Sequence, residues 1–394
     1  MDALRTAAAR WRALLAQLWR ASRLRLALFG ALVLAAGLLP TAAIVLTGAL
    51  AAAIPAAARQ GLGSPGGHAA LLALGGLVAV LAAQQLGGQW LWLVGRAVDA
   101  DYLLEVHHTV ARVALGAPGV ALLEDPAFAA ELQAVSVAEG RGIVQRTASN
   151  LAYVAQQRLR GAGAFIILLG FAWWAPLPLA AAWQLTNLAY LRATRRGMEE
   201  EAGEGGGGMR RGEYLRALAM EPAAAKEIRV FGAGPWVVAR YTEAWGQSLH
   251  ALWQSRRSSR ALDAASVAAL VVAHAAVLGA LGAAAARGQL GVAALLVFVQ
   301  AAIATADLGL VGDLQWYLSH SLRLAHRLER LAGRARLLPA APSPRPPPAS
   351  GPVGVRLDGV RFTYPGRSEP TLDGLTLHVL PGQSLAVVGE NGAG

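Results

Sequence analysis

Two long stretches of the chain contain no charged side chain, and they constrain the fold more than any other feature. The first, Leu26–Ala58, would be about 50 Å long as a helix, whereas the hydrocarbon core of a bilayer is about 30 Å thick. The second is Ala69–Gly95, which follows a glycine-rich turn. Charged residues make up 15% of the chain, and soluble domains carry about 25%. These features predict a membrane protein.

The distribution of apolar residues predicts six transmembrane helices. We expect them at approximately residues 26–56, 69–95, 148–172, 177–198, 262–286 and 290–312. The first is predicted as one long helix kinked at Pro40, because no polar turn divides it. Residues 173–178 combine tryptophans with prolines and predict a tight turn between the third and fourth spans. Residues 287–291 predict a short turn between the fifth and sixth.

Residues 1–25 have the pattern of an amphipathic helix. Large apolar side chains recur at helical spacing on one face, and they are Trp11, Leu14, Leu15, Leu18 and Trp19. Several arginines accompany this stripe, so we expect the helix to lie in the inner headgroup layer. A targeting segment is the alternative, but the apolar run that follows is much longer than a signal-peptide core.

The net charge of +11 comes from arginine, since Lys226 is the only lysine. Arginines flank the apolar runs, with six before Leu26 and few in the expected outer turns. This asymmetry predicts a multi-pass protein of the cytoplasmic membrane with both termini in the cytoplasm. It indicates that the arginines interact with the lipid bilayer and not with nucleic acid. The absence of cysteine excludes disulfides and cysteine metal sites, and we expect no metal site.

Residues 339–352 contain seven prolines and predict a stiff, extended linker. From Val353 onward the apolar period becomes two, which is typical of strands. The short apolar run Ser384–Val388 predicts a buried strand that leads into a glycine-rich segment. The sequence therefore predicts a second domain over residues 353–394.

The glycine-rich segment follows the phosphate-binding pattern G-x-x-x-x-G-K-[ST]. Its residues are Gly389, Glu390, Asn391, Gly392, Ala393 and Gly394, with glycines at both required positions. In such a loop the backbone N–H groups surround phosphates, a lysine reaches the outer phosphates and a hydroxyl group binds Mg²⁺. The lysine and hydroxyl positions would follow Gly394. We therefore expect a nucleotide-binding segment in which no catalytic residue is present.

The order of these segments resembles an ABC exporter half-transporter, in which six membrane helices precede a nucleotide-binding domain. The most specific part is residues 355–365, followed by residues 372–377 and by the loop 389–394. The resemblance implies that ATP and Mg²⁺ bind a longer version of the domain, and that adenine stacks on Tyr364. It also implies a second half-transporter as partner, identical or related, and a transported substrate of unknown identity.

Two cytoplasmic segments resemble the coupling helices of that family, which fit into grooves of the nucleotide-binding domains. In the first, Asp125 can cap a helix, Pro126 suits its first turn and Phe128 offers an apolar contact to a partner domain. The second covers residues 221–232 and ends at a glycine. The coupling residues expected in it are Lys226, Glu227 and Arg229. An ordinary solvated helical turn is the alternative for each segment.

The segment Glu204–Gly208, which contains four consecutive glycines, departs from the family pattern, because a continuous helix is expected there. Each glycine costs about 1 kcal/mol relative to alanine inside a helix. The run would break the helix that leads to the second coupling segment, unless packing against neighbouring helices compensates for that cost.

Polar residues on the third predicted span are candidates for a substrate cavity. They are Gln156, Gln157, Arg158 and Arg160, and the last lies about 20 Å along the helix from Trp173. Charges at that depth usually face a protein interior or a water-filled cavity. The alternative is that both arginines extend to the inner headgroups. His274 and Asp307 are weaker candidates.

Together these features predict an all-α polytopic membrane domain with two coupling helices over residues 26–338. The incomplete, β-rich start of an α/β P-loop ATPase domain is predicted to follow. We expect a subunit of an ATP-driven exporter that does not hydrolyse ATP by itself as written. The alternative is a non-catalytic structural or inhibitory subunit that pairs with a full-length relative. A receptor or channel is disfavoured, because the strands, Tyr364 and the loop occur in the order of the exporter family.

Overall fold

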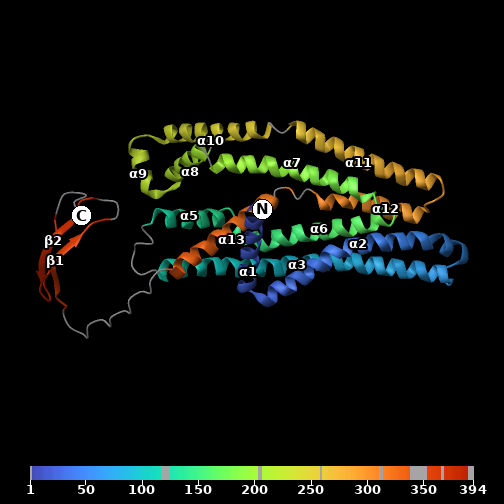
Figure 1. The fold of residues 1–394 in the computed structure, drawn as a ribbon, viewed down its shortest axis with the longest axis horizontal. Coiled ribbons are helices and arrows are strands. Elements are labelled where there is room, and N and C mark those ends of the chain that lie inside the picture. The colour runs from blue at the N-terminus through green and yellow to red at the C-terminus, as the bar shows by residue number, and fades with distance from the viewer. Residues whose placement is uncertain are drawn as a thin grey trace. The chain divides into compact units, whose positions relative to one another are not determined.

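The computed structural model describes residues 2–116, 125–202, 206–257, 260–309, 312, 314–337, 353–364 and 368–388. The chain divides into two compact units, Met1–Leu338 and Pro339–Gly394. The first unit is helical and the second contains a small sheet (Figure 1). The predicted linker, residues 339–352, lies outside the described residues.

Twelve α-helices are described in the first unit. They are α1 (Asp2–Ala21), α2 (Arg23–Gln60), α3 (Pro65–Gly116), α5 (Pro126–Gly140), α6 (Thr147–Leu169), α7 (Pro176–Ala202), α8 (Gly206–Met220), α9 (Pro222–Val230), α10 (Gly234–Arg257), α11 (Arg260–Ala286), α12 (Val292–Ala304) and α13 (Leu314–Leu337). Two short 3₁₀-helices, η1 (Val144–Arg146) and η2 (Thr305–Leu308), precede α6 and follow α12. Of the glycine run, residues 206–208 begin α8, whereas Glu204 and Gly205 lie outside the described residues.

Three of the described helices are long and apolar enough to cross a membrane, by length and composition. They are α2, α3 and the part of α11 from Ala261 to Ala286. The apolar helix Val292–Leu308 is shorter. Helices α6 and α7 lie where the third and fourth spans are predicted. The arrangement of six spans stays a prediction.

Helix α2 is continuous through Pro40 and Pro55, as expected for a single helix without a polar turn. It lies side by side with α3, α6 and α12 (Figure 1). Glycine allows these close approaches, because a Cβ atom on Gly37 would lie 2.7 Å from the Leu159 side chain. Gly163 of α6 faces Thr41 of α2 in the same way. Small residues at such contacts let helix backbones approach and pack by van der Waals forces.

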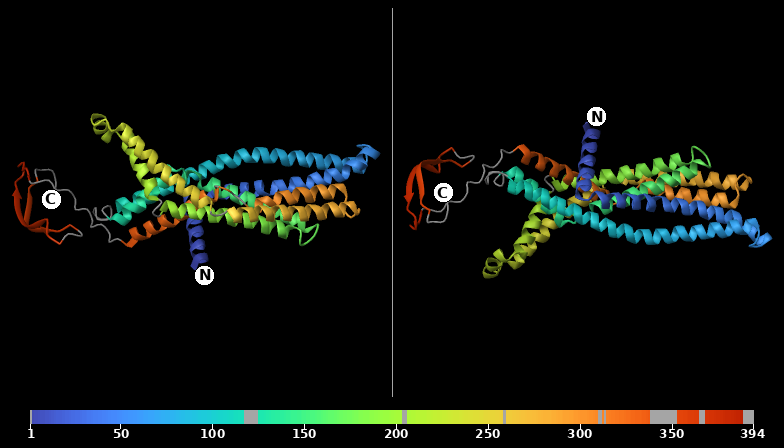
Figure 2. Two further views of the ribbon diagram at one scale, coloured as in Figure 1. Left: turned by 90° about the horizontal axis from the view of Figure 1, so that it is seen from above. Right: turned by 90° about the horizontal axis from the view of Figure 1, so that it is seen from below.

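Helix α1 crosses the long helices rather than running along them (Figure 2). Its apolar stripe is divided between two environments. Leu14 and Leu18 are fully buried in a core shared with α3 and α13, whereas Leu15 and Trp19 are about half exposed, at 48% and 49%. The stripe is wider than a single protein contact can cover, so one side packs on protein and the other stays exposed.

Asp99 of α3 connects this core to the start of α6. It lies four residues beyond the second predicted span and is 2% exposed. Its carboxylate accepts hydrogen bonds from the backbone N–H groups of Ala148 (2.7 Å) and Ser149 (3.3 Å) and from the Ser149 hydroxyl (2.5 Å). These donors belong to the first turn of α6, where N–H groups lack partners within the helix. Burial raises the pKa of Asp99 from 3.8 to about 6, although these hydrogen bonds act against the increase.

The second unit contains strands β1 (Val355–Phe362) and β2 (Leu372–Val379), which pair antiparallel. The register places Val355 opposite Val379 and Leu357 opposite Leu377, and irregularities follow between Leu357 and Phe362. Strands are therefore present where the period of two predicts them.

The predicted strand at Ser384–Val388 is not formed, and this expectation was wrong. The segment has no assigned secondary structure, and Val387 and Val388 are 88% and 90% exposed. A strand is stabilised by its hydrogen bonds to a neighbour, and the sheet within the described residues consists of β1 and β2. Apolar composition alone therefore does not create a strand here.

Candidate functional site

The sixth predicted span departs from α-helical geometry inside the apolar region. Helix α12 ends at Ala304, η2 follows, and α13 begins at Leu314. Thr305 lies 13 residues after Val292, which corresponds to about 20 Å of helix. The predicted sixth span would place it inside a bilayer core of about 30 Å. Backbone groups at this depth need partners from the protein, because lipid offers none. We call residues 305–309 the helix break.

Two arginines of α6 bind the helix break through one residue. The Arg160 Nε atom lies 3.3 Å from Asp307 Oδ2, and Arg158 Nη1 donates to the Asp307 main-chain oxygen at 3.2 Å. Gly161 permits this approach, since a Cβ atom there would lie 2.7 Å from the Leu308 backbone nitrogen. The two arginines and one aspartate leave one net positive charge at the break. The structure thus brings together two of the predicted cavity residues with the weaker candidate Asp307.

Side-chain amides join the break to α7 and α13. Gln184 donates to the Leu308 main-chain oxygen at 2.9 Å, and Asn187 donates to Gln184 at 3.5 Å. Gln315 in turn donates to the Asn187 Oδ1 atom at 2.5 Å. Sequence reasoning did not select these three residues. For Gln184 and Asn187, the available signal was the presence of polar amides in the uncharged run Gly161–Leu191.

Some polar atoms near the break are buried without a hydrogen-bond partner. These are Gln157 Oε1, Trp183 Nε1 and Gln315 Oε1. The ring of Trp183 packs beside Gly309, where a Cβ atom would lie 2.6 Å from the Trp183 Cβ. Gln156, by contrast, donates to the Ala152 main-chain oxygen of its own helix at 3.3 Å. Buried polar atoms without partners are uncommon in native proteins and are places where a polar ligand or water gains hydrogen bonds.

His274 packs between helices and does not join the polar cluster. Its Nδ1 atom donates to the Leu270 main-chain oxygen at 2.8 Å. The ring lies edge-on to Trp183, with centroids 6.3 Å apart. Among the described residues, no group of three histidine or acidic side chains could hold a metal ion.

The first predicted coupling segment forms α5. Asp125 caps it by accepting the Ala127 N–H at 2.9 Å, and Pro126 occupies the first turn. Phe128 differs from its expected role, because it is 1% exposed and packs into the core of the helical unit. A partner domain cannot contact it in this arrangement. The sequence suggested that a partner domain would bury Phe128. The core of the same chain buries it instead.

Helix α5 is tied to α13 by charge. Glu131 lies 3.4 Å from Arg327 and 2.8 Å from Arg330. A movement of α5 would therefore pull on α13, whose N-terminal end begins just after the helix break. These ion pairs are partly exposed and each contributes about 0–1 kcal/mol, so they orient the two helices more than they stabilise them.

The second predicted coupling segment forms α9 at the surface. None of its residues is buried, so Lys226, Glu227 and Arg229 are all accessible. The chain turns after it at Gly232, whose φ of 59° favours glycine. Large apolar side chains are exposed on and around this helix, and they include Met220 (75%), Val230 (72%), Phe231 (79%) and Trp236 (56%). Exposed apolar side chains grouped in this way are typical of a contact surface.

Tyr364 follows β1 and is 40% exposed. Its ring packs edge-on against the ring of Phe362, with centroids 5.0 Å apart, and this contact orients the tyrosine ring. An accessible aromatic face of this kind can stack on a nucleotide base. The predicted phosphate-binding residues, Gly389 to Gly394, lie outside the described residues.

No protein-family model matches the chain. A segment is 42% identical over 73 residues to an uncharacterized ABC transporter ATP-binding protein of Mycobacterium tuberculosis, covering 17% of this chain and 10% of that protein. Another match is 52% identical over 40 residues to an ATP-dependent lipid A-core flippase of Dechloromonas aromatica, covering 10% of this chain and 7% of the flippase. A hemin import ATP-binding protein of Streptomyces coelicolor is 48% identical over 59 residues, covering 15% of this chain and 20% of that protein.

The chain therefore spans a fifth or less of the length of each of these relatives. The similarities support the ABC transporter family and the use of ATP. They agree with the family that the sequence resembles.

Proposed function

We propose that the chain is a subunit of an ATP-driven ABC exporter that moves a substrate across the cytoplasmic membrane by alternating access. This proposal rests on the presence of two kinds of segment in one chain. Helices long and apolar enough to cross a membrane occur together with segments similar to ABC transporter ATP-binding proteins. A pump of this kind needs both parts, because ATP supplies the free energy and the helices form the path.

The nucleotide would be held by the second unit. Tyr364 fits the adenine ring, since its face is partly exposed and its orientation is fixed by Phe362. The loop from Gly389 to Gly394 would surround the phosphates with backbone N–H groups. Bound Mg²⁺ would neutralise negative charge on the outer phosphates.

The coupling helices would connect nucleotide binding to the membrane helices. The exposed apolar side chains around α9 suit docking to a nucleotide-binding domain, with Lys226, Glu227 and Arg229 around them. Helix α5 would transmit a movement to α13 through Glu131. Because α13 continues from the helix break, this contact would link the cytoplasmic side to the polar cluster in the membrane.

The substrate would meet the polar cluster at the helix break. One net positive charge and buried polar atoms without partners favour an anionic or polar group. The competing role for the arginines is contact with inner headgroups. The ion pair of Arg160 with Asp307, and the hydrogen bond of Arg158 to the same residue, favour contact with the helix break, and the Arg160 side chain stays 45% exposed. Two such chains, or this chain and a related one, would assemble as the transporter.

The test uses the complete reading frame that contains this chain, purified and reconstituted in liposomes with Mg²⁺ and ATP. The proposal predicts ATP hydrolysis with a KM that Tyr364→Ala raises about tenfold, because base stacking on an aromatic ring is worth about 1–3 kcal/mol. Tyr364→Phe is the matched control, since it keeps the ring and should keep the KM.

Two other results would count against the proposal. If the protein copurifies one-to-one with a related ATPase and its own Tyr364 variants leave the KM unchanged, the non-catalytic structural or inhibitory subunit is favoured. If neither the protein nor its complex hydrolyses ATP, the exporter proposal is refuted.

A further inference from the structure

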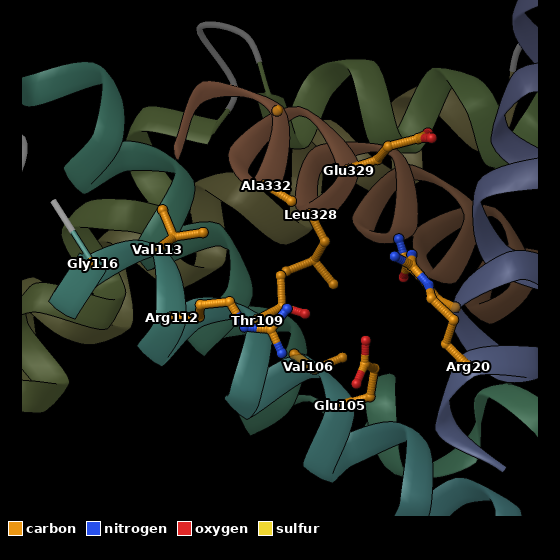
Figure 3. A pocket seen from close by; sticks show the side chains of 12 residues that line it. Arg20, Glu105, Val106, Thr109, Arg112, Val113, Gly116, Leu328, Glu329 and Ala332 are labelled. Carbon is orange, nitrogen blue, oxygen red and sulfur yellow. The ribbon is translucent and has the colours of Figure 1, made fainter. Parts of the chain in front are cut away.

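A cavity of about 500 Å³ lies between α1, α3 and α13 (Figure 3). Small-molecule sites commonly have volumes of about 300–1,000 Å³. None of the residues that line the cavity belongs to the polar cluster at the helix break. The cavity is therefore a separate feature, and the inference from it is independent of the transport mechanism.

Charged side chains of both signs line the cavity. Arg20 of α1 and Glu105 of α3 project toward it from two different helices (Figure 3). Arg112 and Glu329 also line it, from α3 and α13. Within the part of the chain that the structure describes, these four side chains form no ion pair, and Arg20 donates only to the Ala16 main-chain oxygen of its own helix, at 3.3 Å.

The space between Arg20 and Glu105 thus separates opposite charges that do not touch. If the pair only stabilised the fold, direct contact would be expected, as in the Arg25–Asp101 pair at 2.8 Å nearby. A ligand that carries an anion and a cation a few atoms apart would satisfy both side chains at once. Arginine binds phosphate oxygens well because its guanidinium presents parallel N–H donors.

Buried apolar side chains form part of the remaining wall of the cavity. Val106, Val113 and Leu328 line it and are 2%, 3% and 2% exposed. Gln17, also in the wall, donates to the Ala325 main-chain oxygen at 2.7 Å and accepts from the Tyr102 hydroxyl at 3.2 Å. This hydrogen bonding fixes α1 against α3 and α13. The charged groups are therefore held on a preformed frame.

The position of α1 points to the membrane as the source of the ligand. Trp19 and Leu15 are about half exposed and lie on the same helix as Arg20. Tryptophan side chains concentrate at headgroup depth, and an amphipathic helix with exposed apolar residues lies in that layer. Arg20, next to Trp19 in the chain, is then at the depth of lipid phosphates.

We propose that this cavity binds the headgroup of a phosphatidylethanolamine from the inner leaflet. The lipid phosphate contacts Arg20, and the primary ammonium group donates hydrogen bonds to Glu105. Phosphatidylcholine carries the same charges but its quaternary ammonium has no N–H donor, so it satisfies Glu105 less well. Free phosphoethanolamine has the same headgroup chemistry without the acyl chains.

The experiment measures lipid binding to the intact chain in detergent micelles by native mass spectrometry. Phosphatidylethanolamine and phosphatidylcholine of identical acyl chains are added at equal concentrations, and free phosphoethanolamine is tested separately. We expect wild-type protein to retain phosphatidylethanolamine about tenfold better than phosphatidylcholine, as loss of hydrogen bonds to a charged group predicts. The double variant Arg20→Gln with Glu105→Gln should lose this preference.

Arg12→Gln is the matched control, because Arg12 lies on the exposed surface of the same helix and does not line the cavity. It removes one positive charge from the same helix, as Arg20→Gln does, and should retain the preference. Equal binding of the two lipids by wild-type protein would overturn the proposal without reference to any variant. An unchanged preference in the double variant would also overturn it. If free phosphoethanolamine binds and the protein shows no preference between the two lipids, the ligand is not a lipid headgroup, and the proposal is overturned.

Discussion

Asp99 makes the stability of the helical unit depend on pH in a predictable direction. Its carboxyl group is 2% exposed, and burial raises its pKa from 3.8 to about 6. The folded protein therefore holds the proton more tightly than the unfolded chain. The resulting stabilisation is complete below about pH 3.8 and is lost as the pH rises through about 6.

The magnitude follows from the two pKa values. One pKa unit corresponds to about 1.4 kcal/mol, so ionised Asp99 costs about 3 kcal/mol at pH values well above 6. Linkage gives a change of about 1 kcal/mol between about pH 7.5 and pH 5. Asp99→Asn removes this titration but keeps an oxygen that accepts the Ala148 N–H. Wild-type protein should therefore gain about 1 kcal/mol relative to the variant on acidification over that range.

Equilibrium unfolding in detergent micelles, followed by tryptophan fluorescence at both pH values, measures this difference. Subtracting the variant from wild type cancels the titration of all other groups. Asp101→Asn is the control, because Asp101 lies two residues further along α3 and pairs with Arg25 at the surface. Asp99→Ala should be destabilised at both pH values, since it leaves the N–H groups of α6 without an acceptor. Equal pH responses of wild type and Asp99→Asn would refute the reasoning.

Three further predictions follow from individual residues. His320 is half-buried and hydrogen-bonded to the Trp316 main-chain oxygen, and burial lowers its pKa from 6.5 to about 4. Wild type should therefore lose stability relative to His320→Gln as the pH falls from about 6.5 to 4, which is opposite to the effect of Asp99. Gly161→Ala should lower the thermal midpoint because its Cβ would press on the backbone of the helix break, whereas Gly75→Ala, with nothing within 4 Å, should not. Replacing Arg158 and Arg160 together with glutamine should abolish substrate stimulation of ATP hydrolysis in the complete protein, and unchanged stimulation would exclude them from the substrate cavity.

Several parts of the fold follow from local sequence. The uncharged run from Leu26 predicts one long helix because a helix satisfies its own backbone hydrogen bonds, whatever surrounds it. Strands β1 and β2 form where the period of two places them, since alternation depends only on neighbouring residues. Asp125 and Pro126 start α5 as predicted, because capping involves groups within one helical turn.

Only part of the candidate site could be predicted from the sequence. Arg158 and Arg160 were identified because charges in an apolar run are costly wherever they lie. Their partner Asp307 was rated weaker, since about 150 residues separate it from them in the chain. Gln184 and Asn187 were missed because an amide has no sequence pattern that reveals its partner. The cavity beside α1 was also absent from the sequence analysis, because its walls come from three distant helices.

The sequence by itself predicted long apolar helices suited to a membrane and a strand-containing unit after a proline-rich segment. It did so through composition and periodicity, which act over a few helical turns. Only the tertiary structure decided that Phe128 is buried, that Ser384–Val388 forms no strand, and that α1 divides its apolar stripe between protein and solvent. It also decided which side chains satisfy the helix break. Each of these outcomes depends on what another segment places nearby, and burial, pairing and hydrogen bonding are properties of that contact.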